Sequence, residues 1–325
     1  MTFDLSFRGG PGSYRWWYLD AISDDGEKAL VAIFFIGSVF SPHYARRRDS
    51  GEIAHPEDHI AINVALYEKG RRVAWVFSEY GRHALTLAKR RLRVEKSALS
   101  YNENGGLEID IDDITVARRK RLNGLIRVEP LEAPLTKDYV TLADGHEWRA
   151  HVPRARVTAN FRGFDFSGTG YHDENRGIEP IEKGFSSWSW GRFHDGPGTR
   201  VFFDTESRGT RTVSTIETGG LVNSEKHAAR IVRPSLSNWL LPVPTSYVGG
   251  RSANGSLRIV QPTRVIDRAP FYVRFLASSA RDPGAPLTLG MAEHLSLERT
   301  TRPIVRRMVN LRLALPELGY FGRIP

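Results

Sequence analysis

The stretch from Phe166 to Phe193 reads FSGTGYHDENRGIEPIEKGFSSWSWGRF. It places a polar cluster, residues 171–175, between two runs whose side chains alternate as they do in β-strands. Trp188 and Trp190 are two residues apart, so both indoles project from one face of the second strand. Ring faces attract cations, and an apolar pocket raises the pKa of a carboxyl group. The stretch therefore predicts a β-rich fold and suits the chemistry of a cation.

The same residues also fit a purely structural interpretation. The run Asp173, Glu174, Asn175, followed by Gly177, is a good turn sequence. Tryptophans at alternate positions are usually part of a core. Spacing alone favours the turn and the core over a catalytic site.

The composition is that of an ordinary globular protein. The chain has 325 residues, 40% of them hydrophobic and 26% charged, which predicts one large or two medium domains. The longest apolar run, residues 29–40, is interrupted by Gly37 and Ser38 and fits a buried strand better than a membrane span. Residues 1–12 lack the hydrophobic core of a signal peptide, so we expect a cytoplasmic protein without a cleaved targeting segment.

Positive charge is in excess and is concentrated in short runs. Lys and Arg total 46 against 37 Asp and Glu, a formal net charge of +9. The densest runs are residues 46–48, 89–91 and 118–121, and the first begins an expected exposed loop, residues 46–56. No nucleic-acid-binding motif accompanies them, so we expect no nucleic-acid partner. A solvated surface is the simpler interpretation, and contact with anionic lipid headgroups is the alternative.

Strand patterns separated by turn signals recur along the chain. Residues 14–21 and 29–40 flank a polar turn, and residues 59–67 and 72–78 form a second hairpin pattern. Shorter candidate strands follow, and turn signals recur between them. This rhythm predicts an all-β antiparallel barrel or sandwich.

The pattern begins again near residue 160 without a repeat of fixed period. We therefore expect two consecutive β domains, residues 1–160 and 161–325. Residues 303–315 carry an apolar stripe with helical spacing, opposed by Arg306 and Arg307. A short C-terminal helix packed on a barrel is the default interpretation, and a basic amphipathic contact with a membrane is the alternative.

The sequence contains few of the residue patterns that bind metal ions in proteins. Zero cysteines exclude disulfides and thiolate ligands. There is no Gly-rich phosphate loop, no His-Glu-x-x-His pair and no nucleophile elbow. His55 and His59 have the spacing of helical metal ligands, but Pro56 between them opposes a helix. We therefore expect no metal site.

Several stretches between Tyr14 and Arg299 carry a resemblance to one family: YRWWYLDAISDDG, GSVFSPHYARRR, HIAINVALY, GTGYHDENRG with the SWSWGR run, APFYVRF and EHLSLER. In order and spacing they resemble the carotenoid 1,2-hydratase family, also called hydroxyneurosporene synthase. The resemblance implies two lipocalin-like β-barrels. It also implies a cofactor-independent addition of water to the terminal isoprenyl double bond of an acyclic carotenoid. Terpenoid and polyketide cyclases belong to the same broad superfamily, so the fold alone does not fix the reaction.

The resemblance also implies which residues act in catalysis. A Tyr-x-Asp pattern of the family matches Tyr171 and Asp173, and a His-x-Trp pattern matches His146 and Trp148. Asp173 is then the proton donor, and a neutral His146 orients the water and takes its proton. From spacing alone, His146 would instead be interpreted as a hydrogen-bonded residue of a strand without a catalytic role.

The hydration implied by the resemblance requires a neutral acid and aromatic rings, so we expect further residues to line the site. An isolated alkene is a feeble base, so its protonation needs a neutral carboxylic acid close to the carbon. The tertiary cation that forms needs ring faces, each worth about 0.5 to 2 kcal/mol. The candidate substrate-binding residues are Trp17, Trp188, Trp190 and Tyr272.

The motif departs from the family pattern beside the proposed acid. Glu174 stands where the family commonly has a small residue, and Arg176 follows Asn175. Either Glu174 and Arg176 pair with each other at the surface, or they reshape the site for another substrate.

Three functions remain as hypotheses. The first is a hydratase of acyclic carotenoid or related isoprenoid ends that takes its hydrophobic substrate from a membrane. The second is a cyclase of a terpenoid or polyketide, in which the pocket excludes water. The third is a non-enzymatic lipid carrier with a lipocalin-like cavity.

Overall fold

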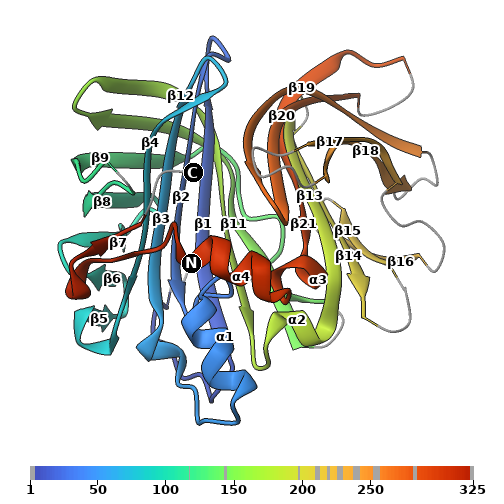
Figure 1. The fold of residues 1–325 in the computed structure, drawn as a ribbon. Coiled ribbons are helices and arrows are strands. Elements are labelled where there is room, and N and C mark those ends of the chain that lie inside the picture. The colour runs from blue at the N-terminus through green and yellow to red at the C-terminus, as the bar shows by residue number, and fades with distance from the viewer. Residues whose placement is uncertain are drawn as a thin grey trace. The chain divides into compact units, whose positions relative to one another are not determined.

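Antiparallel strands dominate the chain, and its helices are short (Figure 1). The computed structural model describes residues 4–116, 118–142, 145–196, 198–208, 213–217, 220–224, 230–236, 242–251, 257–280 and 284–322. The all-β class predicted from the recurring strand patterns is confirmed.

The chain forms two compact units. The first unit comprises residues 1–134, 148–180 and 306–325, and the second comprises residues 135–147 and 181–305. The division predicted at residue 160 falls inside the first unit, beside the turn between β11 (His146–Phe161) and β12 (Phe164–Gly177). These two strands are neighbours in one sheet, so the turn joins strands of the same unit.

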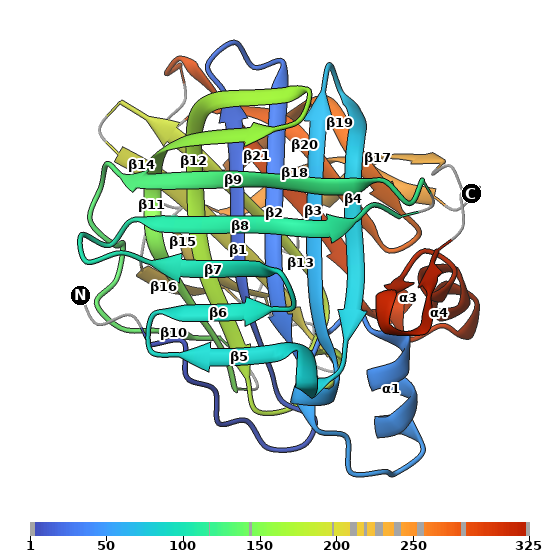
Figure 2. The ribbon, with the colours of Figure 1, turned by 90° about the vertical axis from the view of Figure 1, so that its left-hand side faces the viewer.

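The first unit is built on one large sheet that curls. Its strands follow the order β23-β22-β4-β3-β2-β1-β12-β11-β9-β8-β7-β6-β5. Figure 2 shows β5 to β9 crossing in front of β1 to β4, as expected where a twisted sheet bends toward a barrel. The other bounds are β1 (Tyr14–Ser23), β2 (Lys28–Ile36), β3 (Ile60–Glu68), β4 (Arg71–Tyr80), β5 (Leu85–Ala88), β6 (Arg91–Val94), β7 (Ser97–Tyr101), β8 (Leu107–Ile114), β9 (Arg121–Pro130), β22 (Ala314–Leu315) and β23 (Tyr320–Phe321).

Alternation along these strands creates the core of the first unit. The even-numbered apolar residues of β2 and β3, such as Phe34 and Ile62, lie in one buried cluster. Leu99, Ile109 and Val157 reach the same cluster from β7, β8 and β11. The two parts of the curled sheet are therefore held together by apolar side chains that face one another, and this burial is the main source of stability.

The second unit has its own antiparallel sheet in the order β16-β15-β14-β13-β21-β20-β19-β18-β17. Phe193, Phe202, Val273 and Phe275 lie in its buried core cluster. The strand bounds are β13 (Phe185–Asp195), β14 (Gly198–Ser207), β15 (Val213–Glu217), β16 (Gly220–Ser224), β17 (Arg230–Leu236), β18 (Pro242–Arg251), β19 (Leu257–Ala269), β20 (Tyr272–Ala280) and β21 (Leu287–Ser296). A short strand, β10 (Val140–Thr141), pairs with β11.

Short helices connect the strands. They are α1 (Pro42–Asp49), α2 (Ile181–Gly184), α3 (Leu297–Thr300), α4 (Pro303–Asn310), and the 3-10 turns η1 (Pro56–Asp58), η2 (Arg82–Ala84) and η4 (Pro316–Leu318). The predicted C-terminal helix is confirmed as α4. The loop expected from residue 46 is wrong in its first part, because α1 continues to Asp49. Among the described residues, no helix has the length and apolar character needed to cross a bilayer.

Asp113 is a buried carboxyl group at the end of β8, two residues beyond the core residue Ile111. Its Oδ1 accepts hydrogen bonds from the Ser78 hydroxyl at 3.1 Å and from the backbone N–H of Ile114 at 2.6 Å. Burial outweighs these bonds and raises the pKa of Asp113 from 3.8 to about 6. At neutral pH the fold therefore carries a desolvated charge.

We expect Asp113→Asn to stabilise the protein at pH 8 and to have a much smaller effect on its stability at pH 4. The pKa is raised in the native state, so the stability linked to this group is complete below the unfolded pKa and is lost as the pH rises through about 6. Asparagine keeps the oxygen that accepts both bonds but carries no charge. The free energy of unfolding at pH 8 should rise by about 1–3 kcal/mol, measured by urea denaturation.

The control is Asp110→Asn, which changes an exposed carboxyl group on the same strand. It should leave stability nearly unchanged at both pH values. An equal gain from Asp113→Asn at pH 4 and pH 8 would contradict the account.

Candidate functional site

The Tyr171–Asn175 motif lies within β12 and does not form the turn that its composition also suggested. β12 pairs with β1 without interruption from Gly168 to Gly177. Neighbouring side chains of a strand point to opposite faces. Asp173 therefore shares one face of β12 with Tyr171 and Asn175. Glu174 shares the opposite face with His172.

Asp173 is the centre of an acid cluster that also contains Trp148, Tyr171 and Asn175. The indole N–H of Trp148 donates to Asp173 Oδ2 at 2.9 Å, and the Tyr171 hydroxyl donates to the same oxygen at 2.8 Å. The side-chain amide of Asn175 donates to Oδ1 at 3.0 Å. Asp173 is 3% exposed, and Trp148 and Tyr171 are fully buried. The structure thus brings together Asp173, Tyr171 and Trp148 from the predicted catalytic set and adds Asn175.

The environment of Tyr171 keeps its hydroxyl protonated, so the hydroxyl remains a hydrogen-bond donor. Burial raises the pKa of the Tyr171 hydroxyl well above its usual value of 10.0, and Asp173 adds to this effect whenever it is ionised. Asp20, which lies opposite Tyr171 on β1, acts in the same direction. Tyr171 is therefore neutral at physiological pH, and its hydroxyl proton is directed at the carboxyl group.

Aromatic rings share this face of the sheet with the acid cluster. Tyr18 lies opposite Asp173 on β1, and its ring centroid is 6.4 Å from that of Tyr171. Trp16 lies opposite Asn175, and its ring packs 6.1 Å from Phe35 of β2. The first unit therefore carries aromatic rings that suit a cation on the same sheet face as its buried acid.

A second polar group, the back cluster, lies on the opposite face of β12 and contains Arg15, Tyr101, His151, His172 and Glu174. Glu174 accepts from Arg15 Nε at 2.6 Å and from His151 Nε2 at 3.0 Å. Burial opposes its ionisation, but the hydrogen bond from His151 and the charge of Arg15 lower its pKa to about 2. Of the two alternatives considered for Glu174, its pairing with Arg176 at the surface is wrong, because Glu174 is buried and pairs with Arg15.

His172 joins the same cluster as a neutral ring. Burial, followed by the proximity of His151, lowers the pKa of His172 to about 3. Its Nδ1–H donates to the backbone carbonyl of Tyr18 at 2.8 Å, and its Nε2 accepts from the Tyr101 hydroxyl at 2.5 Å. The rings of His151 and His172 stack at 5.7 Å. β12 is therefore tied to β1 and β7 through one imidazole.

Trp17 lies on the face of the back cluster, because it is opposite Glu174 in the pairing of β1 with β12. It is 1% exposed and belongs to the hydrophobic core of the first unit. The guanidinium of Arg15 lies 4.6 Å from the centre of its ring. The structure does not bring Trp17 to Asp173.

His146 begins β11 and is part of the second unit. Its ring meets Phe185 at 5.4 Å and Phe203 at 5.8 Å, both edge to face. The ring of Trp188 packs on the same Phe203 at 6.1 Å. Two predicted residues, His146 and Trp188, are thus joined through Phe203.

Trp190 and Tyr272 share a face of the sheet of the second unit with Trp188. Trp190 lies opposite Glu293 on β21, and Tyr272 lies opposite Leu295. The hydroxyl of Tyr272 donates to Glu293 Oε2 at 2.5 Å. This acidic partner was not predicted. The role of these residues in substrate binding stays a prediction.

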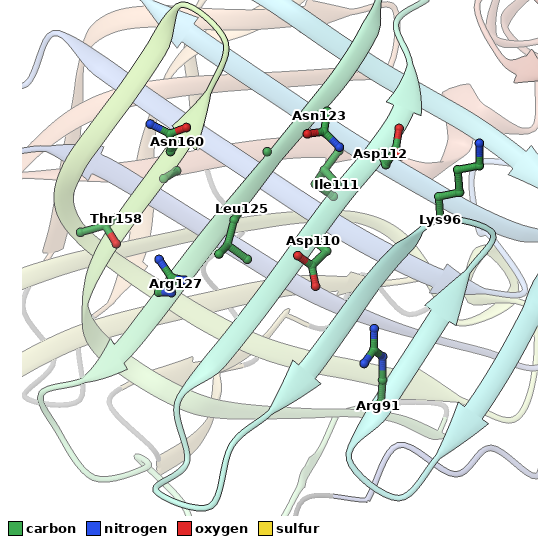
Figure 3. A pocket seen from close by; sticks show the side chains of 12 residues that line it. Arg91, Lys96, Asp110, Ile111, Asp112, Asn123, Leu125, Arg127, Thr158 and Asn160 are labelled. Carbon is green, nitrogen blue, oxygen red and sulfur yellow. The ribbon is translucent and has the colours of Figure 1, made fainter.

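A groove of about 670 Å³ lies on β6, β8, β9 and β11 of the first unit (Figure 3). Figure 3 shows charged side chains along it, among them Arg91, Lys96, Arg127 and Asp110. An isoprenoid chain carries no group that could satisfy these charges, and covering them with hydrocarbon costs free energy. This groove does not fit a carotenoid.

One of the two histidines considered as metal ligands, His59, has another role. His59 Nδ1 lies 2.7 Å from Glu79 Oε1, and His59 stacks on Tyr44 at 4.8 Å. Across the part of the chain that the structure describes, no group of three or more His, Cys, Asp or Glu side chains is arranged to hold a metal ion.

The residues missed from the sequence are Asn175, Arg15, His151 and His172. Asn175 was within reach of sequence reasoning, because it is two residues beyond Asp173 on the same strand and so shares its face. Arg15 contacts Glu174 and His172 contacts Tyr18 between strands that are far apart in the chain, and no local signal marks such pairings. His151 contacts Glu174 between the consecutive strands β11 and β12, and this contact depends on how the two strands pair.

Known proteins share both the sequence and the fold. Residues 32–317 match the family model described as carotenoid hydratase CrtC. The acyclic carotenoid 1,2-hydratase of Thiocapsa roseopersicina is 36% identical over 323 residues, which cover 98% of this chain and 76% of that protein. The acyclic carotenoid 1,2-hydratase of Cereibacter sphaeroides is 31% identical over 292 residues, covering 86% and 96%.

A solved structure supports the fold assignment. The crystal structure of a protein from Nitrosomonas europaea described as AttH has a TM-score of 0.63 and 13% identity, and covers 87% of this chain and 92% of that chain. The predicted lipocalin-like β class is therefore confirmed. The family resemblance seen in the sequence is also confirmed, and the chain belongs to the carotenoid hydratase CrtC family of enzymes.

Proposed function

We propose that the protein adds water to the terminal isoprenyl double bond of an acyclic carotenoid, with Asp173 as the general acid. The observation that carries this proposal is the acid cluster, a buried carboxyl group that accepts from three neutral donors. Membership of the carotenoid hydratase family supports the class of reaction. The relative from Thiocapsa roseopersicina is named for the hydration of an acyclic carotenoid, which supports a hydrophobic isoprenoid as substrate.

Protonation of an alkene carbon places two demands on the acid. The acid must hold its proton until the substrate arrives, and burial favours the neutral form of a carboxyl group. It must then release the proton, and donors aimed at its oxygens stabilise the carboxylate that develops. Trp148, Tyr171 and Asn175 supply these donors. Their hydrogen bonds strengthen as charge develops on Asp173, and this difference between ground state and transition state lowers the barrier.

The cation and the water complete the reaction. The proton adds to the less substituted carbon and leaves the positive charge on the tertiary carbon. Rings such as Tyr18 and Trp148 stabilise that charge by about 0.5 to 2 kcal/mol each. A water molecule bonds to the tertiary carbon and loses a proton, for which His146 is the acceptor implied by the family resemblance. The sum is the addition of H₂O without any change of oxidation state, so the proposed reaction needs no cofactor.

The predicted aromatic residues of the second unit keep a proposed role. Trp188, Trp190 and Tyr272 are proposed to contact the isoprenoid chain, on the strength of the family resemblance. Trp17 is proposed to act through packing, because it lies in the hydrophobic core of the first unit.

We expect Asp173→Asn to lower kcat by about 10²–10⁴-fold, because an amide cannot donate the proton. Purified protein is incubated with lycopene or neurosporene in a lipid dispersion, and the hydroxylated product is measured by chromatography. Substrate binding should persist in the variant. That result would also separate an enzyme from a lipid carrier.

The matched control is Asp165→Asn, which changes an exposed aspartate of the same strand. It should retain wild-type activity. If Asp173→Asn forms product at the wild-type rate, Asp173 is not the acid.

We further propose that the protein collects its substrate at an anionic membrane surface. α1 carries Arg46, Arg47 and Arg48 in its last turn, and the nearby Ile53 is 67% exposed. Arg306 forms an ion pair with Asp49 at the end of α1. Cations next to an exposed apolar side chain suit a headgroup region, where each cation contributes about 1 kcal/mol.

Replacing both Arg46→Glu and Ile53→Ser should weaken binding to anionic phospholipid vesicles in a sedimentation assay, because one charge is reversed and one apolar contact is lost. Vesicles of neutral phospholipid should bind the wild type poorly. Arg162→Glu, an exposed arginine in the turn between β11 and β12, serves as the control for net charge. Equal loss in the control would show that only net charge matters and would contradict a local contact surface.

A further inference from the structure

The strands β11 and β12, which carry the acid cluster on one face, are also joined by a side-chain hydrogen bond on the opposite face. Trp148 and His151 both belong to β11, and Asp173 and Glu174 are neighbours on β12. On one face Trp148 donates to Asp173 at 2.9 Å. On the other face His151 bonds to Glu174 at 3.0 Å. The same two strands are therefore joined by a side-chain hydrogen bond on each side.

The second joint is rigid. Glu174 also accepts from Arg15 Nε at 2.6 Å, so its carboxylate spans β1 and β11 with β12 between them. Arg15 is itself fixed, because its two terminal nitrogens donate to the backbone carbonyls of Ser6 and Asp4 at 2.5 and 2.6 Å. His151 is 5% exposed and Glu174 is 2% exposed. Buried side chains that are held in a hydrogen-bond network of this kind are rigid.

Backbone pairing alone does not fix the acid cluster so closely. The pairing of two strands sets their register, but the twist between neighbouring strands varies over a wide range. A change of twist moves the end of a long side chain such as Trp148 further than it moves the backbone. A bond between β11 and β12 on the opposite face limits that change.

We propose that His151 is a positioning residue for Asp173. By donating to Glu174, it holds β11 against β12 and thereby keeps the Trp148 indole directed at Asp173 Oδ2. The inference rests on the proposed function, since it takes Asp173 as the acid. His151 does not touch the substrate in this account, and its effect reaches the reaction only through Glu174, β11 and Trp148.

The consequence is a specific kinetic pattern. A misplacement of about 1 Å at a reacting group costs up to about 10²-fold in rate. Loss of the His151 bond should therefore lower kcat by about 10–100-fold and leave KM close to the wild-type value. A residue that only contributed stability would lower the melting temperature without this selective effect on kcat.

Three variants of His151 test the proposal. His151→Leu removes the donor, and His151→Asn carries an amide too short to take the place of Nε2–H. His151→Gln places an amide N–H near the position of Nε2 and should restore kcat. All three variants leave the Arg15 and Glu174 side chains in place, and if the Leu variant does not fold, the Asn and Gln pair carries the test.

The readouts are kcat, KM and the NMR resonance of the Trp148 indole N–H, assigned with Trp148→Phe. We expect kcat to fall and the resonance to move in the Leu and Asn variants, and both to return in the Gln variant. Wild-type kcat and an unmoved resonance in the Asn variant would overturn the proposal. So would an equal loss of kcat in the Asn and Gln variants.

The same measurements distinguish failure of the proposed function from failure of the positioning role. If Asp173→Asn remains active in the same assay, the assignment of the acid fails, whereas the resonance of Trp148 still reports whether His151 holds the strands. If Asp173→Asn is inactive and His151→Asn is fully active, only the positioning role fails.

Discussion

The geometry of a β-strand separates two adjacent carboxyl groups and gives them different environments. Asp173 and Glu174 are neighbours on β12, so they must point to opposite faces of the sheet. Glu174 meets a guanidinium and an imidazole, and its pKa falls to about 2. Asp173 meets an indole, a phenol and an amide, all of them neutral donors. One residue becomes a fixed anion that binds strands together, and the other is suited to give up a proton.

The same constraint explains why the aromatic rings matter. A carbocation formed beside Asp173 would lie on the face that carries Tyr18, Trp16 and Phe35, away from the permanent charges of the back cluster. Ring faces attract a cation without bonding to it covalently, so the cation remains open to attack. Whether it is captured by water or by another double bond depends on access of water. Hydration and cyclisation are therefore two outcomes of one intermediate.

Much of the fold could be predicted because the decisive signals are local. The patterns of β1 with β2 and of β3 with β4 predict two hairpins, and the Tyr-x-Asp pattern places Tyr171 and Asp173 on one face of a strand. The exit of the chain to a second unit and its return for residues 306–325 left no local signal. Helix α1 did leave one, because Ser41 caps it and Pro42 stands in its first turn.

The partners of Glu174 show where sequence reasoning stopped. Arg176 is close in sequence, but Arg15, 159 residues away, is the cation that pairs with it. Trp17 shows the same limit, since alternation separates it from Trp16 and Tyr18 but does not say which face holds the acid. Pairings between strands that are distant in the chain decide both questions. No local pattern in a single sequence reveals which distant strands pair.

Isotope labelling of the product is the measurement that tests the central claim most directly. The wild-type protein is incubated with neurosporene in deuterated water enriched in heavy oxygen, and the product is analysed by mass spectrometry. Acid-initiated hydration predicts one carbon-bound deuterium next to a tertiary carbon that carries one heavy oxygen. A product without heavy oxygen, or one without carbon-bound deuterium, would contradict protonation followed by capture of the cation by water.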